Sequence, residues 1–466
     1  MNKDCILKDM DEFINANRER LIQHIKELVD IKSTAGAAVD GMPFGPGPGK
    51  ALEKALEIAK DLGLETFCGD GYVGWASIPG NNILPYIATV THLDVVPEGI
   101  GWNTDPYNMQ EKEGWLLGRG VCDDKGPAVL CLYAAKYLME RNIPLRYGLR
   151  ILMGCNEETG MADIPHYLER HKAPVFCFSP DAGFPVCNGE KGQYQAELAS
   201  REEMKHILEF TGGVALNSVA DQAACLYDGS IRRTEKEGVR VIDENGMTRI
   251  CAVGTGGHAA QPEGTENAIG KVVDYLVENA DLSQAEMKYL FFLQRLFENP
   301  DGSGLGLARN DGRFDPLTLI GGTIRMEGKH LIQTVDCRYP SNIDAEEISR
   351  KLKSASNESV RLKILECRKP FFISPDHPAV VSLKAAYEEV VKETASCYTM
   401  GGGTYARCFP LAVSFGPESR RQEQPSFVGE IHGANEGMET SQLFEALKIY
   451  IRAVILLQMV DFEEKM

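Results

Sequence analysis

Several polar side chains that could bind a metal ion directly follow apolar runs of this chain. His92 and Asp94 come after the apolar run 86–90, and residues two apart on an extended strand point to the same side. A lone His-x-Asp pair also occurs at ordinary polar strand ends. This pair therefore suggests a ligand only if further donors lie near it.

Two pairs of adjacent acids supply such donors. Asp123 and Asp124 lie in the glycine-containing segment 118–127, just before a helix that Pro127 is expected to begin. One acid could cap that helix, but a cap needs only one. Glu157 and Glu158 follow another apolar run, and neighbouring carboxylates repel unless solvent or a cation separates them.

Asp181 and His432, both expected in loops, complete a set of two histidines and several carboxylates. Oxygen donors combined with imidazole are typical of sites for divalent metal ions. The alternative for each element is an ordinary polar loop. Five such elements together favour a metal site.

The positions of these residues follow from the order of the expected elements. Short apolar runs alternate with helical patterns from residue 83 onward, which predicts an α/β domain with a mixed, largely parallel sheet flanked by helices. In such sheets the loops after the carboxyl ends of the strands carry the site. The segment 41–50 is rich in Gly and Pro, so we expect a loop or a flap there.

The pattern changes after Asp181, where shorter alternating runs predict an inserted α+β lid domain. Helical patterns return near the end of the chain. We therefore expect a catalytic domain made of residues 1–188 and 373–466, interrupted by a lid domain at 189–372.

Composition excludes several classes of function. The chain has 466 residues with 67 Asp plus Glu against 49 Lys plus Arg, a formal charge of -18 that repels nucleic acid and anionic membranes. The charged N-terminal segment does not resemble a secretory signal, and no run is apolar enough to span a membrane. The 13 cysteines never occur as C-x-x-C. These observations predict a cytoplasmic protein with neither nucleic acid nor membrane as a partner.

Five motifs follow one another along the chain: THLDVVP (91–97), GRGVCDDKGP (118–127), NEETG (156–160), SPDAGFP (179–185) and EIHGANE (430–436). In this order they resemble the PepV-type dipeptidases of the co-catalytic metallopeptidase family that includes aminoacylase and succinyl-diaminopimelate desuccinylase. The resemblance extends over nearly the whole chain. It implies two divalent metal ions per chain, with zinc favoured and manganese or cobalt as alternatives.

The resemblance also implies roles for the metal-site residues. Asp123 would bridge the ions. His92 and Asp181 would complete one metal site, and Glu158 and His432 would complete the other. Asp94 would hydrogen-bond the second nitrogen of His92. Glu157 would act as the general base and then as the acid.

Further residues match the family in the expected lid and near the C-terminal end. His258 would stabilise the oxyanion, although a histidine among glycines can also simply cap a turn. Arg338 would bind the terminal carboxylate of the substrate, with Asn217 nearby. The glycine loop would add substrate contacts from Gly402, Gly403 and Thr404, and a tight turn is the equal alternative.

The function implied is a dinuclear metal-dependent dipeptidase that releases the N-terminal residue of small peptides. A deacylase of N-acyl amino acids or N-succinyl compounds is the alternative within the same chemistry. The inserted segment is larger than the lid of dimeric family members, in which the oxyanion histidine comes from a partner subunit. We therefore expect a monomer. The backbone between Asp123 and Asp124 is expected to be cis, as in the resembled family.

Overall fold

The computed structural model describes residues 3–418 and 424–462, which form two compact units. The first unit comprises Met1–Asn188, Ile373–Tyr398 and Gly403–Met466, and the second comprises Gly189–Phe372 with Thr399–Gly402. Each unit has its own cluster of buried apolar side chains. The cluster of the first unit draws on both ends of the chain, from Met10 to Phe462.

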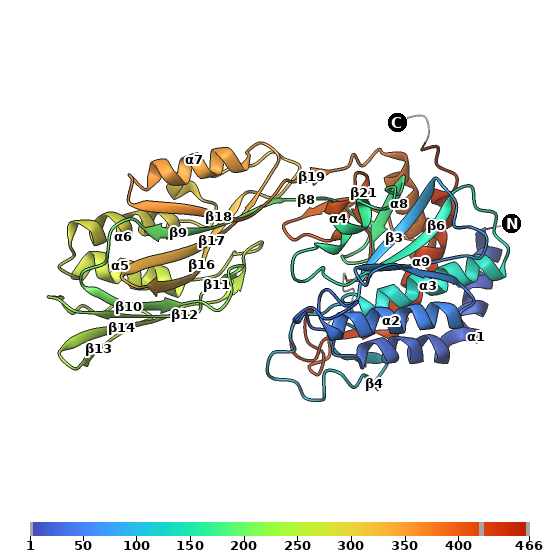
Figure 1. The fold of residues 1–466 in the computed structure, drawn as a ribbon, viewed down its shortest axis with the longest axis horizontal. Coiled ribbons are helices and arrows are strands. Elements are labelled where there is room, and N and C mark those ends of the chain that lie inside the picture. The colour runs from blue at the N-terminus through green and yellow to red at the C-terminus, as the bar shows by residue number, and fades with distance from the viewer. Residues whose placement is uncertain (1–2, 419–423, 463–466) are drawn as a thin grey trace. The chain divides into compact units, whose positions relative to one another are not determined.

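A mixed sheet forms the centre of the first unit (Figure 1). Its strands, in spatial order, are β1 (Glu65–Cys68), β2 (Val73–Ser77), β6 (Gly148–Gly154), β3 (Tyr86–His92), β7 (Phe176–Ser179), β21 (Ala412–Ser414) and β8 (Val186–Glu190). The central strand β3 runs parallel to β6 and β7, and β21 is parallel to β7. The outer pairs are antiparallel.

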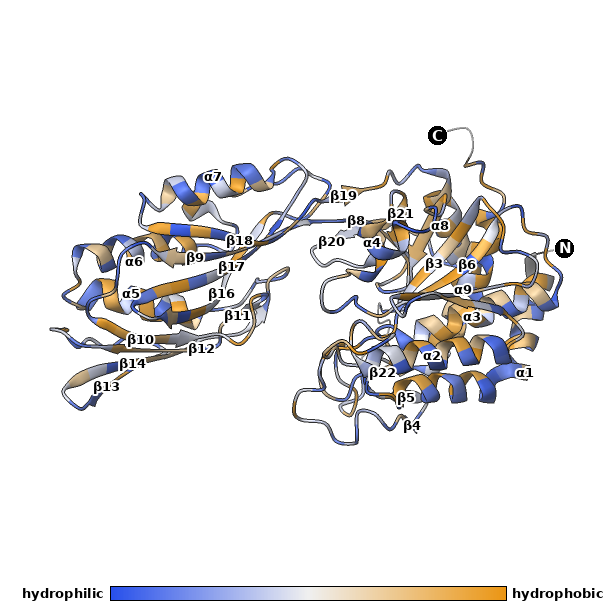
Figure 2. Ribbon diagram, viewed as in Figure 1, coloured by the Kyte–Doolittle hydropathy of each residue, from blue (hydrophilic) through white to orange (hydrophobic). Residues whose placement is uncertain are grey.

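Helices pack on this sheet and on one another. They are α1 (Lys3–Val29), α2 (Pro46–Asp61), α3 (Lys125–Glu140), α4 (Asp163–Leu168), α8 (Pro378–Val391) and α9 (Thr440–Leu457), with the 3-10 turn η2 (Tyr405–Cys408). Helix α3 packs on β3 and β6 and also contacts α1 and α9. Both β3 and β6 are buried along their whole length and carry hydrophobic residues over much of it (Figure 2), as expected for central strands covered on both faces.

A smaller sheet lies beside the segment that carries Asp123. It consists of β4 (Gln110–Lys112), β5 (Trp115–Leu117) and β22 (Gly437–Glu439), with β22 antiparallel to β5. The pairing joins residue 117 to residue 437, although they are far apart in sequence. It thereby brings together the loop that follows β5 and the loop that precedes β22.

The second unit is built on an antiparallel sheet. Its strands, in spatial order, are β13 (Val239–Glu244), β14 (Met247–Val253), β12 (Gln222–Tyr227), β10 (Ile207–Gly212), β16 (Thr318–Glu327), β17 (His330–Tyr339), β9 (Gly192–Ser200) and β18 (Val360–Arg368). The remaining elements are α5 (Ala268–Asn279), α6 (Gln284–Phe297), α7 (Ala345–Ala355), the 3-10 turn η1 (Ser303–Leu305) and the short pair β11 (Ser218–Val219) and β15 (Gly257–His258). Strands β19 (Phe371–Phe372) and β20 (Cys397–Met400) pair with β8 where the chain passes between the units.

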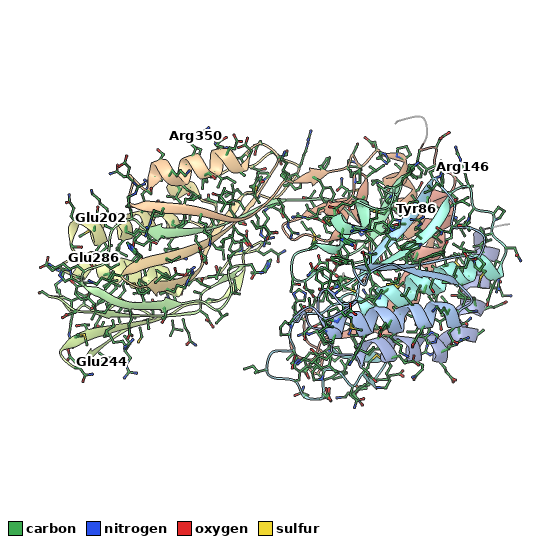
Figure 3. The ribbon with its side chains drawn as sticks, viewed as in Figure 1. Tyr86, Arg146, Glu202, Glu244, Glu286 and Arg350 are labelled. Atoms are coloured by element: carbon green, nitrogen blue, oxygen red, sulfur yellow. The ribbon has the colours of Figure 1, made fainter. Side chains whose placement is uncertain are left out.

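Local signals in the sequence explain where these helices begin. Ser283 and Glu286 form a reciprocal capping box at the start of α6, and Glu286 is labelled in Figure 3. In the first unit, Pro46 occupies the first turn of α2. The prediction of a loop throughout 41–50 is therefore wrong from Pro46 onward, because a proline in the first turn of a helix gives up no intrahelical hydrogen bond.

The predicted fold class, an α/β sheet domain with an inserted α+β portion, is confirmed. None of the helices in the described part of the chain is both long and apolar enough to cross a membrane.

Candidate metal centre

The predicted ligands of the first unit meet at one edge of the central sheet. His92 is the last residue of β3, the strand that Tyr86 begins at the other end (Figure 3). Glu157 and Glu158 follow the end of β6, and Asp181 follows β7. Because β3 is parallel to both neighbours, these loops leave the sheet at the same edge.

Asp123 reaches this edge from the loop between β5 and α3. The peptide bond between Asp123 and Asp124 is cis, which confirms the prediction for this bond. The loop packs tightly against the first turn of α3: a Cβ atom added at Gly126 of the helix would lie 2.1 Å from the carbonyl oxygen of Val121. Only glycine therefore fits at this point of the motif.

The ligand atoms form two clusters that share Asp123. His92, Asp123 and Asp181 form one cluster and Asp123, Glu158 and His432 the other, with the ligand atoms of each within 4.8 Å of one another. The Nε2 atom of His92 lies 2.7 Å from Asp123 Oδ1, and that of His432 lies 2.7 Å from Asp123 Oδ2. Each oxygen of this one carboxylate thus faces a different histidine.

Donor chemistry and burial fit divalent metal ions. The set consists of imidazole nitrogens and carboxylate oxygens, which are common ligands of zinc and manganese. Glu157 is 9% exposed, and its Oε1 atom is buried without a hydrogen-bond partner among the residues that the structure describes. A buried carboxylate oxygen without a donor is costly unless a cation or an ordered water lies beside it.

Comparison with known proteins identifies the family. The sequence profile of peptidase family M20/M25/M40 matches residues 88–455. The chain belongs to this family.

Two bacterial relatives align over almost their full length. A putative dipeptidase of Bacillus subtilis, YtjP, is 30% identical over 97% of this chain and 97% of that protein. The Beta-Ala-Xaa dipeptidase of Lactobacillus delbrueckii subsp. lactis is 27% identical over 95% of this chain and 97% of that protein. Among solved structures, human carnosine dipeptidase 1 has the same fold, with a TM-score of 0.62 at 15% identity over 98% of this chain and 99% of that chain. The predicted family is confirmed, and this M20 chain is a metallohydrolase of a family that uses divalent metal ions.

The pKa values of the histidines and of Asp123 in the M20 site are shifted because their opposite charges are buried side by side. Burial disfavours the charged form of His92, yet the Asp123 carboxylate raises the pKa of His92 well above its ordinary value. The pKa of His432 rises to about 12 despite burial, because Asp123 and Glu158 accept from its ring. In turn the two histidines hold the pKa of Asp123 below its ordinary value, against the effect of burial.

The pKa values of other carboxyl groups at the site are raised, in contrast to the lowered pKa of Asp123. Burial raises the pKa of Glu157, Glu158 and Asp181, and neighbouring carboxylates raise each of them further. Without further positive charge, these groups therefore resist ionising together. Divalent cations would supply that charge.

Asp94 occupies a different place from the one expected. The Nδ1 atom of His92 lies 2.9 Å from the backbone carbonyl oxygen of Asp94, but 3.6 Å from its carboxylate. Both carboxylate oxygens instead accept backbone amides, from Glu157 and Glu158, at 3.1 Å each. A main-chain oxygen thus orients the imidazole, and the carboxylate holds the loop after β6.

Asp124 also differs from the simplest expectation of a helix cap. It stands at the N-cap position of α3, but its side chain makes no capping hydrogen bond. Its Oδ2 atom accepts the backbone amide of His92 at 3.2 Å. The second acid of the pair therefore supports the end of β3.

Asp163 and Tyr405 form a support that sequence reasoning missed. Asp163 Oδ2 accepts the backbone amides of Cys155 at 2.7 Å and Asn156 at 3.1 Å, and it also accepts the hydroxyl of Tyr405. Burial raises the pKa of Asp163 to about 6. Asn156 immediately precedes Glu157, so this pair fixes the start of the loop that carries the two glutamates. Tyr405 directly follows Thr404 of the glycine loop, and this position beside a predicted substrate contact is the signal in the sequence that could have identified it.

In the second unit the structure brings Asn217 and His258 close together. Strand β11 pairs with β15 so that Ser218 lies opposite His258, and the amide of Ala259 donates to the carbonyl of Asn217 at 2.9 Å. The His258 side chain is exposed, and its Nδ1 atom accepts the amide of Ala260 at 3.2 Å. The antiparallel pairing of β11 and β15 thus places the backbones of Asn217 and His258 next to each other, although the two residues are far apart in the sequence.

Arg338 is held by its own strand. Its Nε and Nη2 atoms donate to the two carboxylate oxygens of Asp336 at 2.6 and 3.0 Å, and Nη1 donates to the carbonyl of Gly401 at 3.1 Å. The guanidinium thus contacts the glycine loop that contains Gly402. Thr404 is buried and uses its hydroxyl to cap η2, where it accepts the amide of Ala406 at 3.0 Å.

Proposed function

We propose that this protein is a dinuclear metal-dependent dipeptidase. The observation that carries the proposal is the division of one carboxylate between two ligand clusters: Asp123 faces His92 with one oxygen and His432 with the other. A shared carboxylate is the ligand that holds two ions about 3.5 to 4 Å apart in co-catalytic sites. His92 and Asp181 would complete one site, and Glu158 and His432 the other.

The peptide substrate is supported by the relatives. The Lactobacillus relative is named a Beta-Ala-Xaa dipeptidase and the Bacillus relative a putative dipeptidase, and both align with this chain almost end to end. We extend that activity to this chain. Release of the N-terminal residue from a dipeptide is the reaction we assign.

Glu157 is the proton carrier in this proposal. When bound, the two divalent ions would polarise the scissile carbonyl and lower the pKa of the attacking water. Within the described part of the chain, Glu157 is the one carboxylate of its pair that belongs to neither ligand cluster, and its buried Oε1 atom has no hydrogen-bond partner there. It takes the proton from the attacking water and returns it to the leaving amine.

The second unit would act as the lid domain. His258 would donate to the oxyanion of the tetrahedral intermediate. Such donors stabilise the developing charge best when they are already in position before the reaction. Arg338 would bind the terminal carboxylate of the peptide, with Asn217, Gly402, Gly403 and Thr404 as further contacts. We propose that the working species is a monomer.

The test is a substrate panel on metal-depleted protein reloaded with zinc, manganese or cobalt. We expect dipeptides to give the highest kcat/KM, with tripeptides and N-acyl amino acids well below them. The matched control is Glu157→Gln carried through the same panel, which identifies any background peptidase. A preference for N-acyl amino acids would assign the deacylase function instead, and full activity after rigorous metal removal would contradict both.

A further inference from the structure

A fully buried ion pair lies behind the metal-ligand loops. Nη1 of Arg119 lies 2.6 Å from Oε2 of Glu436, and both side chains are 1% exposed. Taking two charges out of water is costly, and good geometry with additional hydrogen bonds is needed to offset that cost. The remaining hydrogen bonds of the pair show what it holds.

Glu436 holds the loop that carries Asp123. Its Oε1 atom lies 3.0, 3.1 and 3.4 Å from the backbone nitrogens of Gly120, Cys122 and Asp123, which donate to it. One carboxylate oxygen therefore gathers three amides of the loop, including that of the shared ligand itself.

Arg119 holds the other segment, the one that carries His432. Its Nη2 atom donates to the backbone carbonyl of His432 at 3.1 Å, and to those of Pro97 and Glu98 at 3.4 and 3.3 Å. The residue from the Asp123 loop thus holds the His432 segment, while the residue from the His432 segment holds the Asp123 loop. Each side of the pair fixes the backbone of a ligand on the other side.

The ion pair is not needed merely to join these two segments. The β5–β22 ladder already joins them, with Leu117 opposite Gly437. Asp123 and His432 both lie beyond the end of that ladder, where backbone pairing no longer sets their separation. The contacts of Arg119 and Glu436 fall in this region.

We propose that Arg119 and Glu436 are positioning residues that set the separation of Asp123 and His432, and with it the affinity for the ion held by Asp123, Glu158 and His432. The inference rests on the proposed function, because it requires a metal ion in that cluster. Asp123 belongs to both clusters, but His432, whose carbonyl Arg119 holds, belongs to only one, so the ion of the His92 cluster should depend on the pair less.

The decisive variant is Glu436→Gln, which keeps the size of the side chain. An amide has one acceptor oxygen, so its NH2 group must face either the loop amides or the Arg119 guanidinium, and both are donors. We call the ion of the His92, Asp123 and Asp181 cluster the first ion and that of the Asp123, Glu158 and His432 cluster the second ion. We expect the affinity for the second ion to fall by about 10- to 100-fold, the usual effect of losing a partner that orients metal ligands. The first ion should remain, so the metal-depleted full-length protein should bind one zinc ion tightly and the second weakly in a calorimetric titration.

A matched control separates positioning from stability. Glu389→Gln breaks another ion pair of the same unit, a partly buried one in which Arg452 Nε of α9 donates to Glu389 Oε2 of α8 at 2.8 Å. It should lower the melting temperature and leave both zinc affinities at the wild-type values. If Glu436→Gln proves unable to fold, Arg119→Lys replaces it, because lysine keeps the charge but cannot form the fork that spans Glu436 and His432.

The outcomes are distinct. Loss of the second ion in the Glu436 or Arg119 variant, but not in the control, supports the inference. Two wild-type affinities in a folded Glu436→Gln protein, or an equal loss of affinity in the control, overturn it while the proposed function stands. A wild-type protein that binds no zinc or only one ion would overturn the proposed dinuclear function itself.

Discussion

The carboxylate of Asp94 accepts the backbone amide of Glu157 at 3.1 Å. The end of β3 is thereby linked to the loop after β6, and the proposed general base is held through its main chain. The second oxygen of Asp94 makes the same contact with Glu158. One buried side chain thus sets the backbone of both the proposed proton carrier, Glu157, and the proposed metal ligand, Glu158.

The first prediction follows from this contact. Asp94→Asn leaves one acceptor oxygen for two amides, and its NH2 group must face one of them. We expect kcat for a dipeptide to fall by about 10- to 100-fold, with a smaller change in KM. Steady-state kinetics on the metal-loaded protein measure both.

Asp30→Asn is the control for this substitution. Asp30 also accepts a backbone amide, that of Met109 at 2.8 Å, in the same unit but outside both ligand clusters. It should leave kcat close to wild type. An Asp94→Asn enzyme within about twofold of wild type, well short of the usual effect of such partners, would show that the contact with Glu157 is dispensable.

The second prediction concerns metal removal and pH. In metal-free protein, burial and like charges raise the pKa of Glu157 above its ordinary 4.5, as they do for Glu158. Such a carboxyl binds more protons in the folded than in the unfolded chain, so the free energy of unfolding falls as pH rises from the unfolded pKa through the folded one. The contribution of His432 has the same sign: it is present below 6.5 and is lost as pH rises toward about 12.

Metal ions should remove this loss, because they bind the deprotonated ligands and neutralise their charge. The increase in melting temperature on adding zinc should therefore be larger at about pH 8 than at about pH 6. Thermal unfolding with zinc and with chelator at both pH values measures it. The lowered pKa of Asp123 acts in the opposite direction only below its ordinary 3.8, outside this window. A zinc effect that is equal or smaller at the higher pH would contradict the prediction.

The third prediction contrasts two adjacent glutamates. Glu158 belongs to a ligand cluster and Glu157 does not, so Glu158→Gln should lose metal and activity together. Glu157→Gln should keep both ions and lose about 10²- to 10⁴-fold in kcat, the usual contribution of general acid-base catalysis. Elemental analysis beside turnover separates the two effects. Loss of metal in the Glu157 variant with retention in the Glu158 variant would exchange the two roles.

Much of the architecture could be predicted from sequence because local signals carried it. The buried strands β3, β6 and β7 are short, largely apolar runs at or just after whose ends polar residues stand, and the carboxyl ends of parallel strands share one edge of a sheet. The same rule indicated why His92 and Asp181 should lie near each other.

The supporting residues could not be derived in the same way. Arg119 and Glu436 are separated by most of the chain, and nothing in the periodicity of either segment indicates that they pair. The position of the Asp94 carboxylate depends on which of two acceptors, its own carbonyl or its side chain, lies nearer to His92 Nδ1. Such choices are made by packing at the level of single atoms, which residue types and spacing do not specify.

The fourth prediction concerns Arg338, the residue proposed to bind the terminal carboxylate of the substrate. Arg338→Lys loses the planar fork that is held by Asp336, so we expect KM for dipeptides to rise by about tenfold or more while kcat changes less. Dipeptide amides, which lack the terminal carboxylate, should be nearly insensitive to the substitution. Arg325→Lys is the control, because Arg325 pairs with Glu197 at 2.7 Å in the same sheet. Equal effects on dipeptides and their amides would remove Arg338 from substrate binding.

The last prediction tests whether one chain is sufficient for catalysis. His258 lies on the β11–β15 pair of the inserted unit, and we propose that it acts on substrate bound to its own chain. His258→Ala and Glu157→Ala should each be inactive, and a mixture of the two should stay inactive, because neither chain carries both groups. Pre-incubation of the mixed chains at high concentration, followed by a dipeptide assay and by light scattering for mass, gives both readouts. Activity that rises in the mixture, together with a dimeric mass, would show that the histidine works on the partner's substrate and that the functional unit is a dimer.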